Sequence, residues 1–155
     1  MFNQEALTYI NQSVLCWLAT VDADGIPNVS PKEAFTAYGN SELLIANIAS
    51  PSSARNILIN PNVCVSFVDI FVQKGYKVKG IASLIKPSDA NFSLVEAPLL
   101  TITQGKFPIH GIFRIQANSI QPIVAPSYWL FPSLTEDAQV QSAMQTYGVI
   151  GESPA

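Results

Sequence analysis

The stretch "ANIASPSSARNI" places small polar residues where an apolar run ends and a helix is expected to begin. Ser50 suits the N-cap position, and Pro51 suits the first helical position because no amide hydrogen is needed there. The backbone amides and hydroxyls of Ser52 and Ser53 then remain free at the positive end of the helix dipole. The stretch predicts an anion site that suits a phosphate, although serine and proline also begin many helices that bind nothing.

Further basic and polar side chains could reach the same anion. Arg55, about one turn into the helix, could supply a two-pronged contact. Alternate residues of a strand share a face about 7 Å apart, so Lys77 and Lys79 of "GYKVKG" point the same way. A third set shares one face of "PNVSPKE": Asn28, Ser30 and Lys32. Each set alone is equally typical of a solvated sheet face, and the three converge only if the helix lies at the mouth of the sheet.

The sequence offers little other chemistry. His110 is the only histidine, so no histidine-based metal cluster is expected, and a serine or cysteine nucleophile would have one imidazole at most as its base. The acidic residues show no spacing that indicates an acid and base pair. We therefore predict no metal site and assign no catalytic residue; if the protein is an enzyme, a cofactor carries the chemistry.

Composition narrows the class of protein. The 155 residues suit one domain, and the combination of 48% hydrophobic and only 12% charged residues suggests that a partner, such as a second copy, covers part of the surface. A net charge of -3 without a basic tract argues against nucleic acid as a partner. No apolar run is long enough to span a membrane, and the first residues lack the order of a signal peptide, so we expect a cytoplasmic protein with no membrane partner.

The hydrophobic pattern predicts a sheet of antiparallel hairpins with helices inserted. Two cysteines, Cys16 and Cys64, fall in strand-like runs and are expected to be buried, reduced thiols. Helices are expected within 3–12, from 51, within 86–100 and within 135–148, the last capped by Thr135. Strands are expected within 14–22, as one long strand within 26–38, within 41–48, 63–70 and 76–85, and within 109–125 as one or two strands with a break near Pro122.

Three segments in this order resemble the pyridoxamine 5'-phosphate oxidase-like family of FMN-binding split barrels: "CWLATVDADGIPNVSPK", "LLIANIASPSSARNILINPNVCVSFVD" and "GYKVKGIASLI". The resemblance covers roughly residues 10–86. It implies a mainly β fold, a six-stranded antiparallel split β-barrel with flanking helices that forms a single domain over 1–155. It also implies a homodimer with one FMN per chain at the interface, touched by both chains, with the C-terminal segment 125–150 packing there.

The resemblance further implies which residues bind the cofactor. Ser30, Pro31 and Lys32 would line the flavin ring or its ribityl side, and Asn47 would lie at the end of the third strand. The phosphate would be held by the turn that contains Ser50, Ser52, Ser53 and Arg55, and Lys77 and Lys79 match the basic strand of the family. Many relatives carry a lysine or arginine at the position of Ser52, and here Arg55 follows one turn later instead.

The implied function is that of an FMN-binding oxidoreductase that passes electrons or hydride to a small molecule. Two alternatives stay open: a non-catalytic flavin-binding or electron-transfer module, and a split barrel that holds haem or a deazaflavin instead of FMN, in which His110 would be a candidate axial ligand. True pyridoxamine 5'-phosphate oxidases carry further basic residues for the phosphate of the substrate. Because Lys106 and Arg114 are isolated here, vitamin B6 oxidation is not expected.

Overall fold

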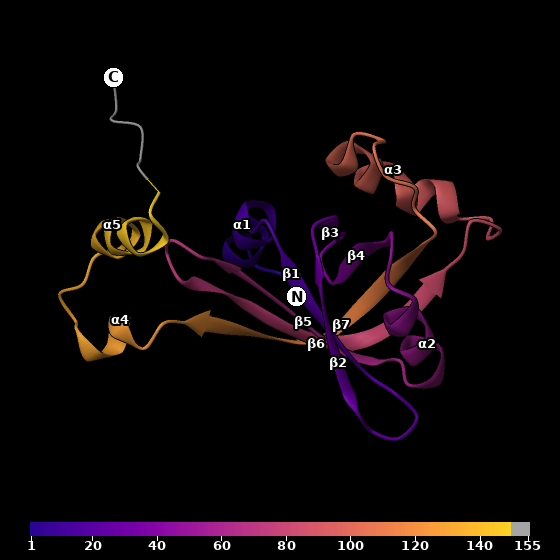
Figure 1. Ribbon diagram of the computed structural model, residues 1–155, viewed down its shortest axis with the longest axis horizontal. Coiled ribbons are helices and arrows are strands. Elements are labelled where there is room, and N and C mark those ends of the chain that lie inside the picture. The colour runs from indigo at the N-terminus through magenta and orange to yellow at the C-terminus, as the bar shows by residue number, and fades with distance from the viewer. Residues whose placement is uncertain (150–155) are drawn as a thin grey trace.

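The computed structural model describes residues 1–149 as a sheet of seven antiparallel strands with five helices around it (Figure 1). The strand order in the sheet is β2-β1-β5-β6-β7-β4-β3. The helices are α1 (Gln4–Gln12), α2 (Pro51–Ile59), α3 (Phe92–Thr103), α4 (Ser127–Leu130) and α5 (Glu136–Tyr147). The strands are β1 (Cys16–Val21), β2 (Pro27–Lys32), β3 (Phe35–Tyr38), β4 (Glu42–Asn47), β5 (Asn62–Asp69), β6 (Lys74–Ile85) and β7 (Gly111–Val124).

A two-residue corner forces the sheet to curl. β2 and β3 are the two opposite edges of the sheet, yet only Glu33 and Ala34 separate them in the chain. A segment this short spans roughly 10 Å at most, so the edges must approach each other. The amide of Ala46 in β4 donates to the carbonyl of Ala34 at 2.9 Å and closes the corner. The sheet is therefore a split barrel, and Lys32 lies where the barrel closes.

β4 carries apolar side chains on both faces because both faces are covered. Leu43 and Ile45 belong to the core inside the barrel, whereas Leu44 and Ala46 belong to a second cluster beneath α3. A run of apolar residues without alternation is typical of a strand that is buried on both sides. The strand that leads to the candidate site is thereby held from both sides.

Helix α2 is fixed against the barrel by one apolar and one polar contact. Ile57 enters the barrel core. The side-chain amide of Asn56 donates to the hydroxyl of Thr20 in β1 at 3.0 Å, and both residues are buried. These contacts determine where the N-terminus of α2 lies.

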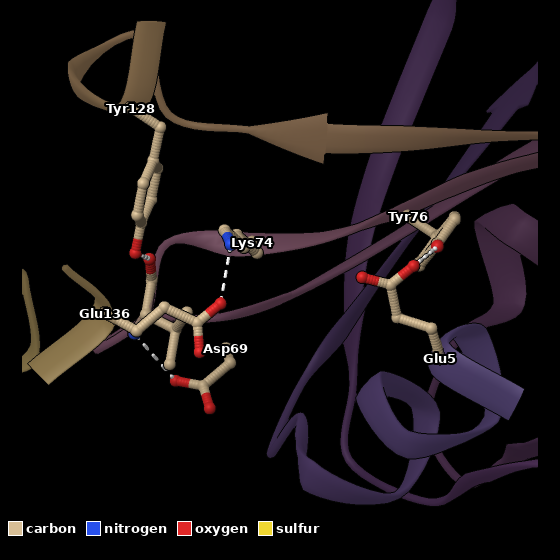
Figure 2. A network of polar contacts seen from close by, with 7 residues as sticks. Glu5, Asp69, Lys74, Tyr76, Tyr128 and Glu136 are labelled. Atoms are coloured by element: carbon tan, nitrogen blue, oxygen red, sulfur yellow. Dashed lines mark hydrogen bonds and ion pairs between the residues drawn. The ribbon is translucent and has the colours of Figure 1, made fainter. Parts of the chain in front are cut away.

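The C-terminal segment forms an arm that is attached to the tip of the β5–β6 hairpin (Figure 2). Lys74 forms an ion pair of 2.5 Å with Glu136 of α5, and the hydroxyl of Tyr128 in α4 donates to the carbonyl of Val72 at 2.8 Å. The hydrogen bond with Glu136 raises the pKa of Lys74. The arm therefore extends from the hairpin, away from α2 and α3 (Figure 1).

Most of the predicted elements are confirmed. The first helix, α2, α3 and the β5–β6 hairpin lie where the pattern placed them, and Thr135 caps α5 by accepting from the amide of Ala138 at 3.2 Å. Cys16 is buried, and burial raises the pKa of its thiol to about 12, whereas Cys64 is only half-buried. No helix among the described residues is long and apolar enough to cross a membrane.

Two details of the strands differ from the predictions. The single strand expected within 26–38 is two strands, β2 and β3, because the chain turns the corner between the edges after Lys32, and the sheet therefore has seven strands rather than six. β7 shows no break at Pro122. Beyond Gln116 the strand pairs with β6 alone, so Pro122 lies on a free edge, where a missing amide hydrogen costs no ladder bond.

We predict that Thr20→Val destabilises the protein by about 1–3 kcal/mol because the buried amide of Asn56 loses its acceptor. Urea denaturation at equilibrium measures the loss. Thr20→Ser is the matched control, since it keeps the hydroxyl and removes only a methyl group. A Thr20→Val variant no less stable than Thr20→Ser would show that this hydrogen bond does not anchor α2.

Candidate functional site

A cavity of about 600 Å³ lies where the barrel closes. Three segments surround it, with Leu15 before β1 beside them: the end of β2 with the following corner, the turn from β4 into α2, and the end of α3 with the loop that follows. Apolar and polar residues line it in nearly equal numbers: Leu15, Ser30, Pro31, Lys32, Glu33, Ala34, Ala46, Ile48, Ala49, Ser50, Ile102, Thr103, Gln104, Lys106 and Phe107. A mixed lining of this kind suits a small organic ligand that has both apolar and polar parts.

Lys32 is the buried charge of this cavity. The residue is only 6% exposed, and its ammonium donates to the hydroxyls of Ser30 and Ser50. No carboxylate forms an ion pair with Lys32 in the part of the chain that the structure describes. Burial lowers the pKa of its side chain. Since a buried cation without a countercharge is costly, the site favours an anionic ligand.

The turn into α2 brings the serine hydroxyl to this lysine. Asn47, the last residue of β4, accepts a hydrogen bond of 3.0 Å from the amide of Ser50 through its side chain and so fixes the turn. Ser50 occupies the N-cap position, but its side chain does not cap the helix, contrary to the prediction, because it accepts from Lys32 instead. The first amides of α2 are consequently left without a side-chain cap from Ser50.

Three other predicted residues lie on α2 itself and do not line the cavity. Arg55 is exposed and donates to the hydroxyl of Ser52 at 3.2 Å. The hydroxyl of Ser53 is buried without a hydrogen-bond partner among the described residues. No acidic residue occupies the first turn of α2. The start of the helix therefore keeps a positive character next to the cavity.

Lys77 and Lys79 lie elsewhere. Val78 between them is fully buried in the barrel core, so both lysines point to the outer face of the sheet, beside Ser66 and Cys64 of β5. The structure thus brings Ser30, Pro31, Lys32 and Ser50 together, with Asn47 behind them, and leaves the other five predicted residues outside the lining.

The sequence interpretation missed the third wall of the cavity. The end of α3 contributes Thr103, which is 7% exposed and whose hydroxyl has no partner among the described residues, and the loop that follows contributes Lys106 and Phe107. The motifs that carry the resemblance in the sequence end near residue 86, before this wall. The only local signal is the "TQGK" turn, where Gln104 and Gly105 both have positive φ values. His110 follows the loop but is exposed and does not line the cavity.

These residues fit a ligand that has a phosphate and a flat apolar part. The ammonium of Lys32, the guanidinium of Arg55 and the amides at the start of α2 are all donors suited to a phosphate. Ala34, Ala46 and Ile48 offer an apolar wall beside them. The one carboxylate among the lining residues, Glu33, is exposed. The donor set is thus compatible with FMN.

Comparisons with known proteins point to one family. Residues 2–111 match the family model described as "Pyridoxamine 5'-phosphate oxidase". No curated protein matches the chain.

Solved structures share the fold. HupZ from Group A Streptococcus is 26% identical, with a TM-score of 0.67 and coverage of 77% of this chain and 92% of that one. An FMN-binding protein from Syntrophomonas wolfei is 17% identical, with a TM-score of 0.67 and coverage of 79% and 86%. The heme storage protein HutZ from Vibrio cholerae is 25% identical, with a TM-score of 0.59 and coverage of 77% and 92%.

We predict that Lys32, unlike an exposed lysine, changes how the free energy of unfolding depends on pH. Between the lowered pKa of native Lys32 and the ordinary value of 10.5, the unfolded chain binds a proton that the native state has lost, so this group makes the free energy of unfolding rise with pH. Lys32→Met removes that contribution. Urea denaturation across the alkaline range, relative to wild type, measures the difference.

Lys86→Met, which removes an exposed ammonium outside the cavity lining, is the matched control for the loss of a lysine charge. If Lys32→Met and Lys86→Met give the same profile, the burial of Lys32 imposes no cost, and the case for an anion beside it is lost.

Proposed function

The chain belongs to the pyridoxamine 5'-phosphate oxidase family, and we propose that it is a flavoprotein that binds FMN and transfers electrons or hydride to a small molecule. The observation that carries the proposal is the buried ammonium of Lys32, which has no carboxylate partner among the described residues and lies beside the start of α2. FMN combines the anion that this charge favours with a flat ring that the cavity wall suits.

In the proposed complex the protein binds and orients the cofactor. Lys32 and the first amides of α2, with Ser52 and Arg55 at the helix surface, hold the phosphate. Pro31 and Ser30, at the end of β2, lie against the ring. FMN, when bound, supplies the electron or hydride transfer. Ser30 would polarise the ring through a hydrogen bond, so no side chain need act as an obligate base.

We also propose that the protein is a homodimer whose interface includes the outer face of the sheet. Trp17, Val29 and Ile81 are exposed on the face that also carries Lys77 and Lys79. On the C-terminal arm Trp129, Leu130 and Phe131 are 69%, 70% and 61% exposed. Exposed apolar patches of this kind mark association surfaces. In such a dimer Lys77 and Lys79 would lie at the interface, within reach of the flavin of the partner subunit.

The haem alternative has less support in the geometry. HutZ is described as a heme storage protein, but His110, the only histidine of this chain, is exposed and outside the cavity lining. An axial ligand would have to face the cavity. FMN therefore remains the cofactor that the site supports best.

We predict saturable binding of about one FMN per chain, followed by quenching of flavin fluorescence in a titration of the apo protein. Arg55→Ala and Lys32→Met should each weaken binding by about 1.5–3 kcal/mol, because each removes a charged hydrogen-bond donor to the phosphate. Lys86→Ala, which removes an exposed lysine outside the cavity lining, is the control and should bind like wild type.

Unchanged affinity in Lys32→Met would contradict the proposed role of the buried lysine. Absence of FMN binding by a folded wild-type protein, checked by circular dichroism, would refute the flavoprotein proposal and move the search to haem or a deazaflavin. Turnover of a nicotinamide donor with an artificial acceptor separates an oxidoreductase from a non-catalytic flavin-binding module.

Analytical ultracentrifugation tests the dimer. Wild type should sediment as a dimer at micromolar concentration, and Trp129→Glu should shift it toward monomer, since a charge would be buried in an apolar interface. Leu94→Glu, at another exposed apolar position, is the control. If neither the wild type nor Leu94→Glu dimerises, the proposed interface does not exist.

A further inference from the structure

A second cavity, of about 400 Å³, adjoins the first. It lies between the end of α1, strand β3 and the C-terminal half of α3. Ile10, Phe35, Pro98 and Ile102 give it apolar walls. Glu33 and Ile102 are exposed and line both cavities, so the two cavities meet at these residues. A molecule in the second cavity therefore lies directly beside the proposed flavin site.

One polar group of the second cavity is unused. Ser13 follows α1 and is 8% exposed, and its hydroxyl has no hydrogen-bond partner among the described residues. A buried hydroxyl without a partner costs free energy, which a ligand can recover. No hydrogen bond to another described residue holds this hydroxyl, so turning it toward a ligand breaks none.

The charges around the cavity restrict the ligand. Glu33 is the one charged residue among the described residues that line it. A carboxylate disfavours an anion nearby. The walls are apolar, and the remaining polar lining groups are neutral: Asn11, Ser13, Thr36 and Thr101. These features favour an uncharged, largely apolar molecule that carries an amide or carbonyl group.

We propose that the second cavity is the subsite for the substrate or electron donor of this protein, and that it takes the uncharged aromatic amide or carbonyl part of that molecule, with Ser13 as a polar contact. The assignment of the ligand as a redox partner of the flavin rests on the proposed function. The binding of an aromatic amide in this cavity does not depend on the proposed function. Ile102 and Glu33 then lie at the border of the two sites, and the reacting end of the substrate extends past them to the flavin, because hydride transfer needs direct contact.

Benzamide and benzoate form a matched pair of probes, because they share a ring and differ in charge. In ¹⁵N-resolved NMR titrations of the protein without FMN, benzamide should give saturable shifts at the amides of Ser13, Thr36 and Thr101. Benzoate should bind at least several-fold more weakly because of Glu33. Shifts elsewhere only, or equal binding of the two probes, would overturn the proposal.

Two variants test the location. Ser13→Ala should weaken benzamide binding about threefold to tenfold, the range expected for one neutral hydrogen bond. Ile102→Trp, at an exposed position of α3, should fill the border between the two cavities and abolish the shifts. Ser88→Ala, which removes an exposed serine that lines neither cavity, is the control. Benzamide affinity unchanged in both Ser13→Ala and Ile102→Trp would overturn the assignment.

The FMN titration is read separately, through flavin fluorescence, so the two proposals can fail independently. Loss of benzamide binding with FMN binding intact refutes the subsite alone. Benzamide binding without FMN binding keeps a ligand cavity but removes its redox role.

Discussion

The contact on which the site depends is the ammonium of Lys32 held between two serine hydroxyls, one on β2 and one at the start of α2. Hydroxyls solvate a cation, but they do not neutralise it. The protein therefore keeps a positive charge in a place where burial disfavours it, as the lowered pKa of Lys32 indicates. Stability given up at one residue in this way is typical of a functional site, and an anionic ligand is the group that would restore it.

The other elements of the fold position this contact. The corner after Lys32 curls the sheet, because two residues must join its opposite edges. β4 is packed on both faces, and its last residue, Asn47, fixes the turn that places Ser50 at the corner. The Asn56–Thr20 hydrogen bond then fixes α2. α3 covers β4 and ends in the loop that closes the cavity. The contacts that stabilise the corner, β4, α2 and α3 therefore also determine the shape of the site.

The sequence predicted the elements better than the way they meet. Periodicity and capping residues located α1, α2 and α5, because those signals are local. The corner between β2 and β3 was not seen, since nothing local in "SPKEAF" tells a bend between two edges from one long strand. Within the site, Ser30, Lys32 and Ser50 were predicted and do meet. Lys77 and Lys79 were grouped with them because they share one face of a strand and match the basic strand of the family, and within one chain the topology separates them from the cavity. Thr103 and Phe107 were missed because only tertiary packing brings the end of α3 and the following loop to β2.

We expect Lys32 to gain a countercharge only when a phosphate-bearing ligand binds. The most direct test is an NMR titration of the Lys32 side chain, with ¹³C-labelled lysine and assignment by Lys32→Met, in the absence and presence of saturating FMN. The pKa of Lys32 should lie below the ordinary lysine range in the free protein and should clearly increase with FMN bound. An ordinary pKa in the free protein, or a lowered one that FMN leaves unchanged, would refute this role of Lys32.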